Sequence, residues 1–178
     1  MAYSSTKKKS AGIVQISIGI LTVILVVLII AMMMIVSSIQ GTARIVNYAG
    51  LVRGKTQRIV KLEISGKQED DMIQEIESFI DGLMNGNKEL NLVRLEDSDF
   101  QTKMEELNEY FLMLKQEIMQ VRAYGADKTQ ILSKSEHFFE ICDEATGLAE
   151  MYSQRKASSL SVLEKYITAD IVVLILLI

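Results

Sequence analysis

The chain has 178 residues, a formal net charge of −4 at pH 7, one cysteine, one histidine and no proline. A single cysteine excludes an intramolecular disulfide, and a single histidine excludes a metal site built from several histidines. The acidic charge balance and the lack of a basic patch argue against nucleic-acid binding, while the absence of proline is typical of long uninterrupted helices.

The first element is an apolar run from Ile13 to Val36 that contains no charged residue. About twenty apolar residues suffice to cross a bilayer, so the run predicts a transmembrane helix over 13–36. Three lysines, Lys7–Lys9, precede it, which places residues 1–12 in the cytoplasm by the positive-inside rule. A cleaved signal peptide is the alternative, but the run is too long for one and no clear cleavage site follows.

Residues 37–166 form an acidic, polar segment that we expect to be an extracytoplasmic domain. Three glycine-centred breaks divide it into four amphipathic stretches. The breaks are Ser65-Gly66-Lys67, Asn85-Gly86-Asn87 and Tyr124-Gly125-Ala126. The first stretch runs on from the membrane helix to about Ile64, and the second covers roughly 68–84. Four such helices joined by short turns predict an all-α, up-down-up-down antiparallel four-helix bundle flanked by transmembrane helices.

The third and fourth stretches carry regular apolar stripes. Ser98, with Gln101 three residues later, predicts a capping box at the start of the third helix. Its stripe consists of Phe100, Met104, Leu107, Phe111, Leu114, Ile118 and Val121. The fourth helix is expected from about Lys134, with a stripe of Phe138, Cys142, Ala145, Ala149 and Tyr152. On this stripe Cys142 is interpreted as a small buried hydrophobe, with a reactive thiol as the alternative.

A positive charge interrupts one of two stripes on the first helix of the domain. The stripe Ile45, Tyr48, Val52, Ile59 and Leu62 predicts an ordinary core face, and the other is a heptad seam of Ile39, Ala43, Val46, Gly50, Arg53, Gln57 and Val60. A guanidinium withdrawn from water costs several kcal/mol, so Arg53 requires an anion or a water-filled gap. The alternative is that Arg53 faces solvent on a helix that is unpaired there.

A second apolar run begins near Ile167 and continues to Ile178. About a dozen residues cannot span a bilayer as a helix, so we interpret 167–178 as the start of a truncated second transmembrane helix. A shallow anchor is the alternative. Truncation implies a cytoplasmic output domain that is missing from this chain.

The sequence carries no catalytic motif: it has no glycine-rich phosphate cradle, HExxH, CxxC or Gly-x-Ser-x-Gly. We therefore expect no catalytic residue, no cofactor and no metal site in these residues. His137 is interpreted as a solvated or half-buried side chain. The acidic cluster Glu69–Asp71 suits the positive end of a helix dipole, and a calcium site there is the less favoured reading.

The string NYAGLVRGKTQRIVK is similar to a motif, Asn-x-Ala-Gly-x-x-Arg-x-x-x-x-Arg, that follows the first membrane helix of two receptor types. These are the nitrate/nitrite-sensor histidine kinases and the type IV pilus-type methyl-accepting chemoreceptors. The matching residues are Asn47, Ala49, Gly50, Arg53 and Arg58, with Gln57 before the second arginine as in the chemoreceptors. The resemblance implies that Gly50 and Arg53 of two protomers clasp one small planar anion at a dimer interface, with Asn47, Gln57 and Arg58 as further candidate ligand-binding residues.

The leading hypothesis is a homodimeric transmembrane receptor that binds a small anionic or polar solute outside the cell. Its output would be a histidine kinase, a chemotaxis signalling domain or a diguanylate cyclase, and these residues do not choose among them. The alternative is a non-signalling bitopic membrane protein whose bundle binds a protein partner.

Overall fold

The computed structural model describes residues 2–125 and 128–178, and their side chains from residue 12 onward. It contains α1 (Ala2–Ile64), α2 (Asp70–Asn85), α3 (Ser98–Tyr124) and α4 (Lys128–Leu177). Two compact units share these helices: residues 1–39 with 155–178, and residues 40–154. The predictions that concern the side chains of Lys7–Lys9 and the residue Ala126 lie outside the described part.

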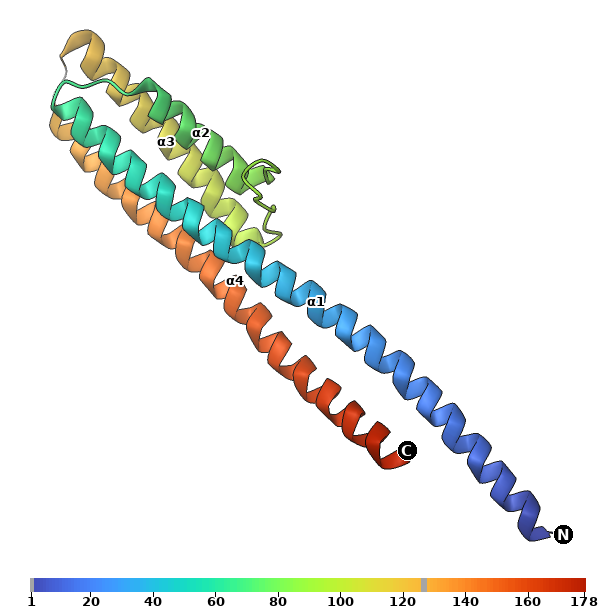
Figure 1. Cartoon of the computed structure of the whole chain (residues 1–178). Helices are drawn as coiled ribbons and strands as arrows, with labels where there is room; N and C mark the ends of the chain where they lie inside the picture. Colours follow the sequence, from blue (N-terminus) through green and yellow to red (C-terminus); the bar gives the residue numbers. More distant parts are fainter. Residues whose placement is uncertain (1, 126–127) are drawn as a thin grey trace. The chain divides into compact units, whose positions relative to one another are not determined.

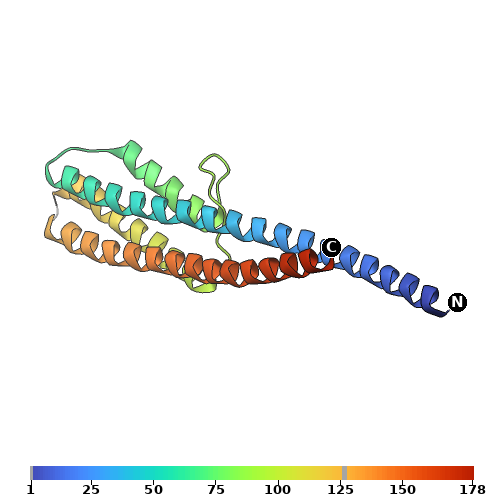
Figure 2. The ribbon, with the colours of Figure 1, turned by 60° about the horizontal axis from the view of Figure 1, so that its bottom comes forward.

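Residues 40–154 fold as a four-helix bundle built from part of α1, all of α2 and α3, and part of α4. Successive helices run in opposite directions and lie side by side in both views (Figures 1 and 2). The all-α antiparallel bundle predicted from the sequence is therefore confirmed.

Glycine ends three of the four helical stretches. Gly66, Gly86 and Gly125 have φ angles of 79°, 81° and 65°. L side chains rarely adopt this left-handed region, whereas glycine enters it without steric cost. After α3 the Gly125 amide donates to the carbonyl of Val121, which satisfies one of the free carbonyls at the helix end.

The core of the bundle follows the predicted stripes. All seven stripe residues of α3 are buried, and on α4 the stripe is buried from Phe138 to Ala149. On α1 the buried face includes Ile45, Val52 and Ile59, as predicted, together with Ala49 and Thr56. Tyr48 is only partly buried, and its ring packs edge-on against Phe79 of α2 with centroids 5.0 Å apart.

Ion pairs join neighbouring helices around the outside of this core. Between α1 and the other helices the pairs are Lys55–Glu75, Glu63–Arg122 and Arg53–Asp143. Between α2 and α3 they are Glu77–Lys115 and Asp70–Arg122, and between α3 and α4 they are Glu117–Lys134 and Lys103–Glu144. Apart from the buried Glu63–Arg122 pair, most of these side chains are partly exposed, so each of the other pairs contributes little stability by itself. The ion pairs help to determine which faces of the helices lie next to each other.

The structure corrects two helix starts. The N-cap of α3 is Asp97, whose carboxylate accepts from the Phe100 amide at 3.1 Å, and Ser98 is the first helical residue. The Gln101 side chain bonds the Leu95 carbonyl at 2.8 Å, so the expected Ser98–Gln101 capping box is wrong. Helix α4 is already formed at Lys128, more than a turn before the predicted start, because the apolar pattern extends back to a buried Ile131.

The connection between α2 and α3 is a loop, part of which projects beyond α1 in the view of Figure 2. Its backbone pairs Asn87 with Leu92 in both directions, at 2.9 and 2.8 Å. The loop buries Leu92 and Leu95, and Arg44 of α1 donates to the Asn91 carbonyl at 3.2 Å. The loop thereby closes one end of the core.

The other compact unit contains the predicted membrane runs. From Gly12 onward α1 is long and apolar enough to cross a membrane by length and composition, with a mean hydropathy of 3.2 in its most apolar window. A cavity of about 300 Å³ in this unit is lined by Leu21, Ile24, Leu28, Tyr166, Ala169, Asp170 and Val173. Asp170 is buried there, and its Oδ2 atom has no hydrogen-bond partner.

Candidate functional site

Arg53 lies at the edge of the α1 surface, on the side that faces α4. Its side chain is 37% exposed, so it is neither part of the core nor fully solvated. Gln57, one turn further along the seam, is half-buried in the same way, whereas Val60 beyond it is buried. Along the seam predicted from the sequence, Arg53 and Gln57 are thus partly buried and Val60 is part of the core, so this side of α1 borders the core.

The outward face of α1 next to Arg53 carries small and polar residues together with the exposed Leu51. Gly50 and Gly54 are one turn apart, and a side chain added at either would meet no atom within 4 Å. Asn47 and Arg58 lie on this outward face and are exposed. Because glycine has no side chain, the α1 backbone is open to a ligand or another helix along this stretch.

Two residues of α4, which sequence reasoning missed, contact the Arg53 guanidinium. Nη1 of Arg53 forms an ion pair with a carboxylate oxygen of Asp143. The guanidinium carbon lies 4.9 Å from the centre of the Phe139 ring, within the range of a cation–π contact. Of the environments expected for Arg53, an anion, a water-filled gap or solvent, the structure thus provides an anion from α4 of the same chain, with the arginine partly exposed.

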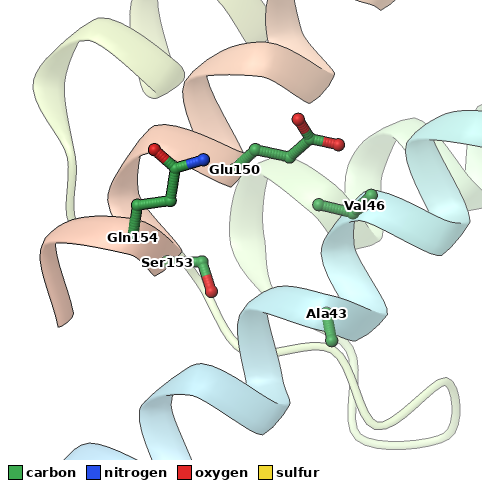
Figure 3. A pocket seen from close by; sticks show the side chains of 5 residues that line it. All are labelled: Ala43, Val46, Glu150, Ser153 and Gln154. Atoms are coloured by element: carbon green, nitrogen blue, oxygen red, sulfur yellow. The ribbon is translucent and has the colours of Figure 1, made fainter. Parts of the chain in front are cut away.

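A cavity lies further along the same α1–α4 surface, as Figure 3 shows. It has a volume of about 330 Å³ and is lined by Ala43, Val46, Glu150, Ser153 and Gln154. Two small or branched apolar side chains of α1 form one wall, and three polar side chains of α4 form the other. The cavity is a hollow at the surface, because Ala43, Glu150 and Gln154 are exposed, whereas Ala49 and Ala149 are fully buried in the core.

The sole cysteine is fully buried next to the ion pair. Burial raises the pKa of the Cys142 thiol to about 12, while the Arg53 charge lowers it and the Asp143 charge raises it. The reactive thiolate is therefore scarce at neutral pH, and the interpretation of Cys142 as a buried hydrophobe holds. His137 is exposed, contacts Glu140 at 3.1 Å and packs against Tyr110.

The site offers a half-exposed cation next to open backbone. A guanidinium presents five N–H donors in a plane, and Asp143 occupies Nη1. No other hydrogen bond to the Arg53 side chain is found within residues 12–125 and 128–178. This chemistry suits binding of a small anion with two or more oxygen atoms.

The fold defines the chain as an antiparallel four-helix bundle. It resembles a solved structure, the ligand-binding domain of the nitrate receptor McpN from P. aeruginosa. The TM-score is 0.56 at 18% sequence identity, and the match covers 62% of this chain and 96% of the other. No protein-family model matches the chain, and no curated protein sequence matches it. At this identity the likeness demonstrates the shared fold.

Proposed function

We propose that the chain is the sensor part of a transmembrane receptor that binds a small anion between two copies of α1. In each protomer Gly50 supplies backbone and Arg53 supplies charge. Asn47, Gln57 and Arg58 border the same interface and complete the binding site. The observation that carries the proposal is the half-exposed Arg53 guanidinium beside a stretch of α1 that two glycines leave open.

Charge and symmetry support an anion as the ligand. A twofold axis along the flank of α1 that carries Gly50 and Arg53 would bring two Arg53 side chains towards each other. Two cations in a partly dry interface repel each other, and one bidentate anion between them relieves the repulsion with charge-assisted hydrogen bonds. Gly50 and Gly54 permit the close helix approach that such a shared site needs.

The neighbouring fold supports a sensory role. The McpN structure is the ligand-binding domain of a nitrate receptor, and its likeness to this bundle makes a sensor the preferred class. Nitrate is accordingly the first ligand to test.

The membrane arrangement belongs to the same proposal. Residues 1–12 are cytoplasmic, 13–36 cross the membrane, 37–166 are extracytoplasmic and 167–178 begin a second crossing. Since α1 is one continuous helix from Ala2 to Ile64, a change in how two copies of α1 pair would pass along it into the membrane segment. A cytoplasmic kinase, chemotaxis or cyclase domain would read that change.

The test uses the full chain in lipid nanodiscs. Thermal unfolding is measured at constant ionic strength with nitrate, nitrite, formate, acetate, sulfate or phosphate, and titration calorimetry gives the stoichiometry. A ligand at 100 times its Kd stabilises the folded state by about 2.7 kcal/mol. We expect one anion for two chains, and we expect Arg53→Ala to lose the response. Lys61→Ala, which removes an exposed positive charge from the same helix, is the matched control and should retain the response. Equal responses of both variants, or none in the unmodified chain, would refute the proposal.

The interface has its own test, independent of any ligand. In a Cys142→Ala background, Asn47→Cys should form a disulfide between two chains under mild oxidation, because Asn47 is on the outward face of α1. Glu109→Cys, an exposed position on α3, is the control and should form no disulfide between chains. Cross-linking at Glu109 alone would place the interface elsewhere.

The second candidate function is docking of a protein partner by a non-signalling membrane protein. It is favoured by Leu112, Met113 and Met119, which α3 exposes to between 40% and 50%. It predicts that no anion stabilises the chain and that Arg53→Ala behaves like Lys61→Ala. The nanodisc experiment therefore separates the two candidates.

A further inference from the structure

The Arg53 guanidinium is engaged within its own protomer before any external anion arrives. Asp143 of α4 pairs with it, and Phe139, one turn earlier on α4, lies under it. Asp143 has no other ion-pair or hydrogen-bond partner among the residues whose side chains the structure describes. The carboxylate is 49% exposed, so it can leave Arg53 for water without being stranded in the core.

An external anion and the Asp143 carboxylate compete for the same positive charge. A bidentate anion finds two N–H groups of the guanidinium free, because Asp143 engages only Nη1. If both were bound, two negative charges would sit on one planar group and repel each other. Full engagement of the anion therefore favours release of Asp143.

We propose that Asp143 is a built-in counter-anion that sets the affinity of the Arg53 site and ties α4 to α1 until a ligand displaces it. The inference rests on the anion-binding function proposed above and adds a regulator to that site. Displacement exchanges a contact between two helices of one protomer for a contact between two protomers. The ligand thereby acts on α4 as well as on α1.

The packing next to the pair allows such a change. Along the same surface α1 and α4 are separated by the cavity between Val46 and Glu150 (Figure 3). Neither Ser153 nor Gln154, which line it, forms a hydrogen bond to a described side chain or backbone group outside its own helix. Release of Asp143 thus removes a specific tie at the solvent-facing edge of the α1–α4 contact, while the core residues Ala49 and Cys142 stay buried.

The experiment compares Asp143→Asn with Glu150→Gln in the full chain in nanodiscs. Both variants remove one negative charge from the same surface of α4, but only the first removes the carboxylate bound to Arg53. Calorimetry measures the Kd of the anion of the panel above that binds the unmodified chain most tightly. We expect Asp143→Asn to tighten binding about two- to fivefold, the range set by a partly exposed ion pair. Glu150→Gln should change the Kd by less than half of that.

The outcomes separate this inference from the proposed function. Anion binding that needs Arg53 but is tightened equally by both variants overturns the role of Asp143 alone, because general electrostatics would explain it. Weaker binding in Asp143→Asn also overturns it, since Asp143 would then position Arg53 for the ligand. No anion binding in the unmodified chain or in either variant overturns the proposed function together with the inference.

Discussion

Glu63, at the end of α1, and Arg122, at the end of α3, form a two-pronged ion pair that is largely withdrawn from water. Their side chains are 3% and 12% exposed, and Nε of Arg122 donates to a Glu63 carboxylate oxygen at 2.9 Å. Asp70, in the first turn of α2, accepts from Nη1 of the same guanidinium at 2.5 Å. The hydrogen bond to Glu63 is the main reason that the pKa of Arg122 is raised. One arginine thereby joins three helices at one end of the bundle.

Replacing Arg122 by methionine is expected to destabilise the bundle by about 3 kcal/mol, because it leaves the Glu63 carboxylate buried without a partner. Thermal unfolding of the chain in detergent, followed by circular dichroism, measures the change. Lys55→Met is the control: its pair with Glu75 is more exposed, and it should cost less than about 1 kcal/mol. The double variant Glu63→Leu/Arg122→Met should recover most of the loss. Equal effects of Arg122→Met and Lys55→Met would contradict this account.

Replacing Gly86 and Gly147 by alanine should change the free energy of unfolding in opposite directions. Gly86 has a φ angle of 81°, and a Cβ added to it would lie 3.1 Å from the backbone nitrogen of Arg94. Gly86→Ala is therefore expected to destabilise the bundle by about 1–2 kcal/mol. Gly147 lies inside α4 with nothing within 4 Å of an added Cβ, so Gly147→Ala should stabilise by about 0.5–1 kcal/mol. The same measurement decides both, and stabilisation by Gly86→Ala would show that the loop conformation is not as described.

The fold could be predicted because core burial imposes a helical period on each helix separately. The α3 stripe from Phe100 to Val121 alternates steps of four and three, and every member is buried. The helix ends at Gly66, Gly86 and Gly125 could be predicted equally well, because each glycine has a positive φ angle that other residues rarely adopt. Such signals are local, and they specify the helices and the faces that must be covered.

The contacts of the candidate site could not be predicted in the same way. Arg53 and Asp143 are 90 residues apart, and the stripes of α1 and α4 do not fix how far one helix slides along the other. A shift of one turn would offer Arg53 a different partner. The sequence indicated that Arg53 needs an anion or a water-filled gap unless it faces solvent, but only the packed structure shows that Asp143 pairs with it.

At the start of α3 the sequence offers two adjacent residues that could serve as the N-cap. Asp97 and Ser98 are adjacent, and both residue types are good N-caps. The structure uses Asp97. We therefore expect Asp97→Ala to lower the free energy of unfolding by about 1 kcal/mol, and Ser98→Ala to change it by a few tenths at most, because the Ser98 side chain caps no backbone amide of α3. If Ser98→Ala lowered the free energy of unfolding more than Asp97→Ala, the capping box predicted from the sequence would be supported instead.

Cys142 should make the stability of the bundle depend on alkaline pH. Burial raises its pKa from 9.0 to about 12 in the folded state, so the thiol deprotonates more readily when the chain unfolds. The folded state therefore keeps the contribution of Cys142 in full below about pH 9 and loses it as the pH rises towards 12. The loss has a limiting slope of about 1.4 kcal/mol per pH unit.

The measurement is the free energy of unfolding in detergent between pH 8 and 10.5, for the unmodified chain and for Cys142→Ala. Lysines and tyrosines titrate in both proteins, so the difference between the two curves isolates the thiol. We expect this difference to be constant near pH 8 and then to shift by up to about 2 kcal/mol against the unmodified chain by pH 10.5. Parallel curves over the whole range would mean that the thiol is as accessible to water in the folded bundle as in the unfolded chain. That result would be incompatible with the tight packing of Cys142 beside the Arg53–Asp143 pair.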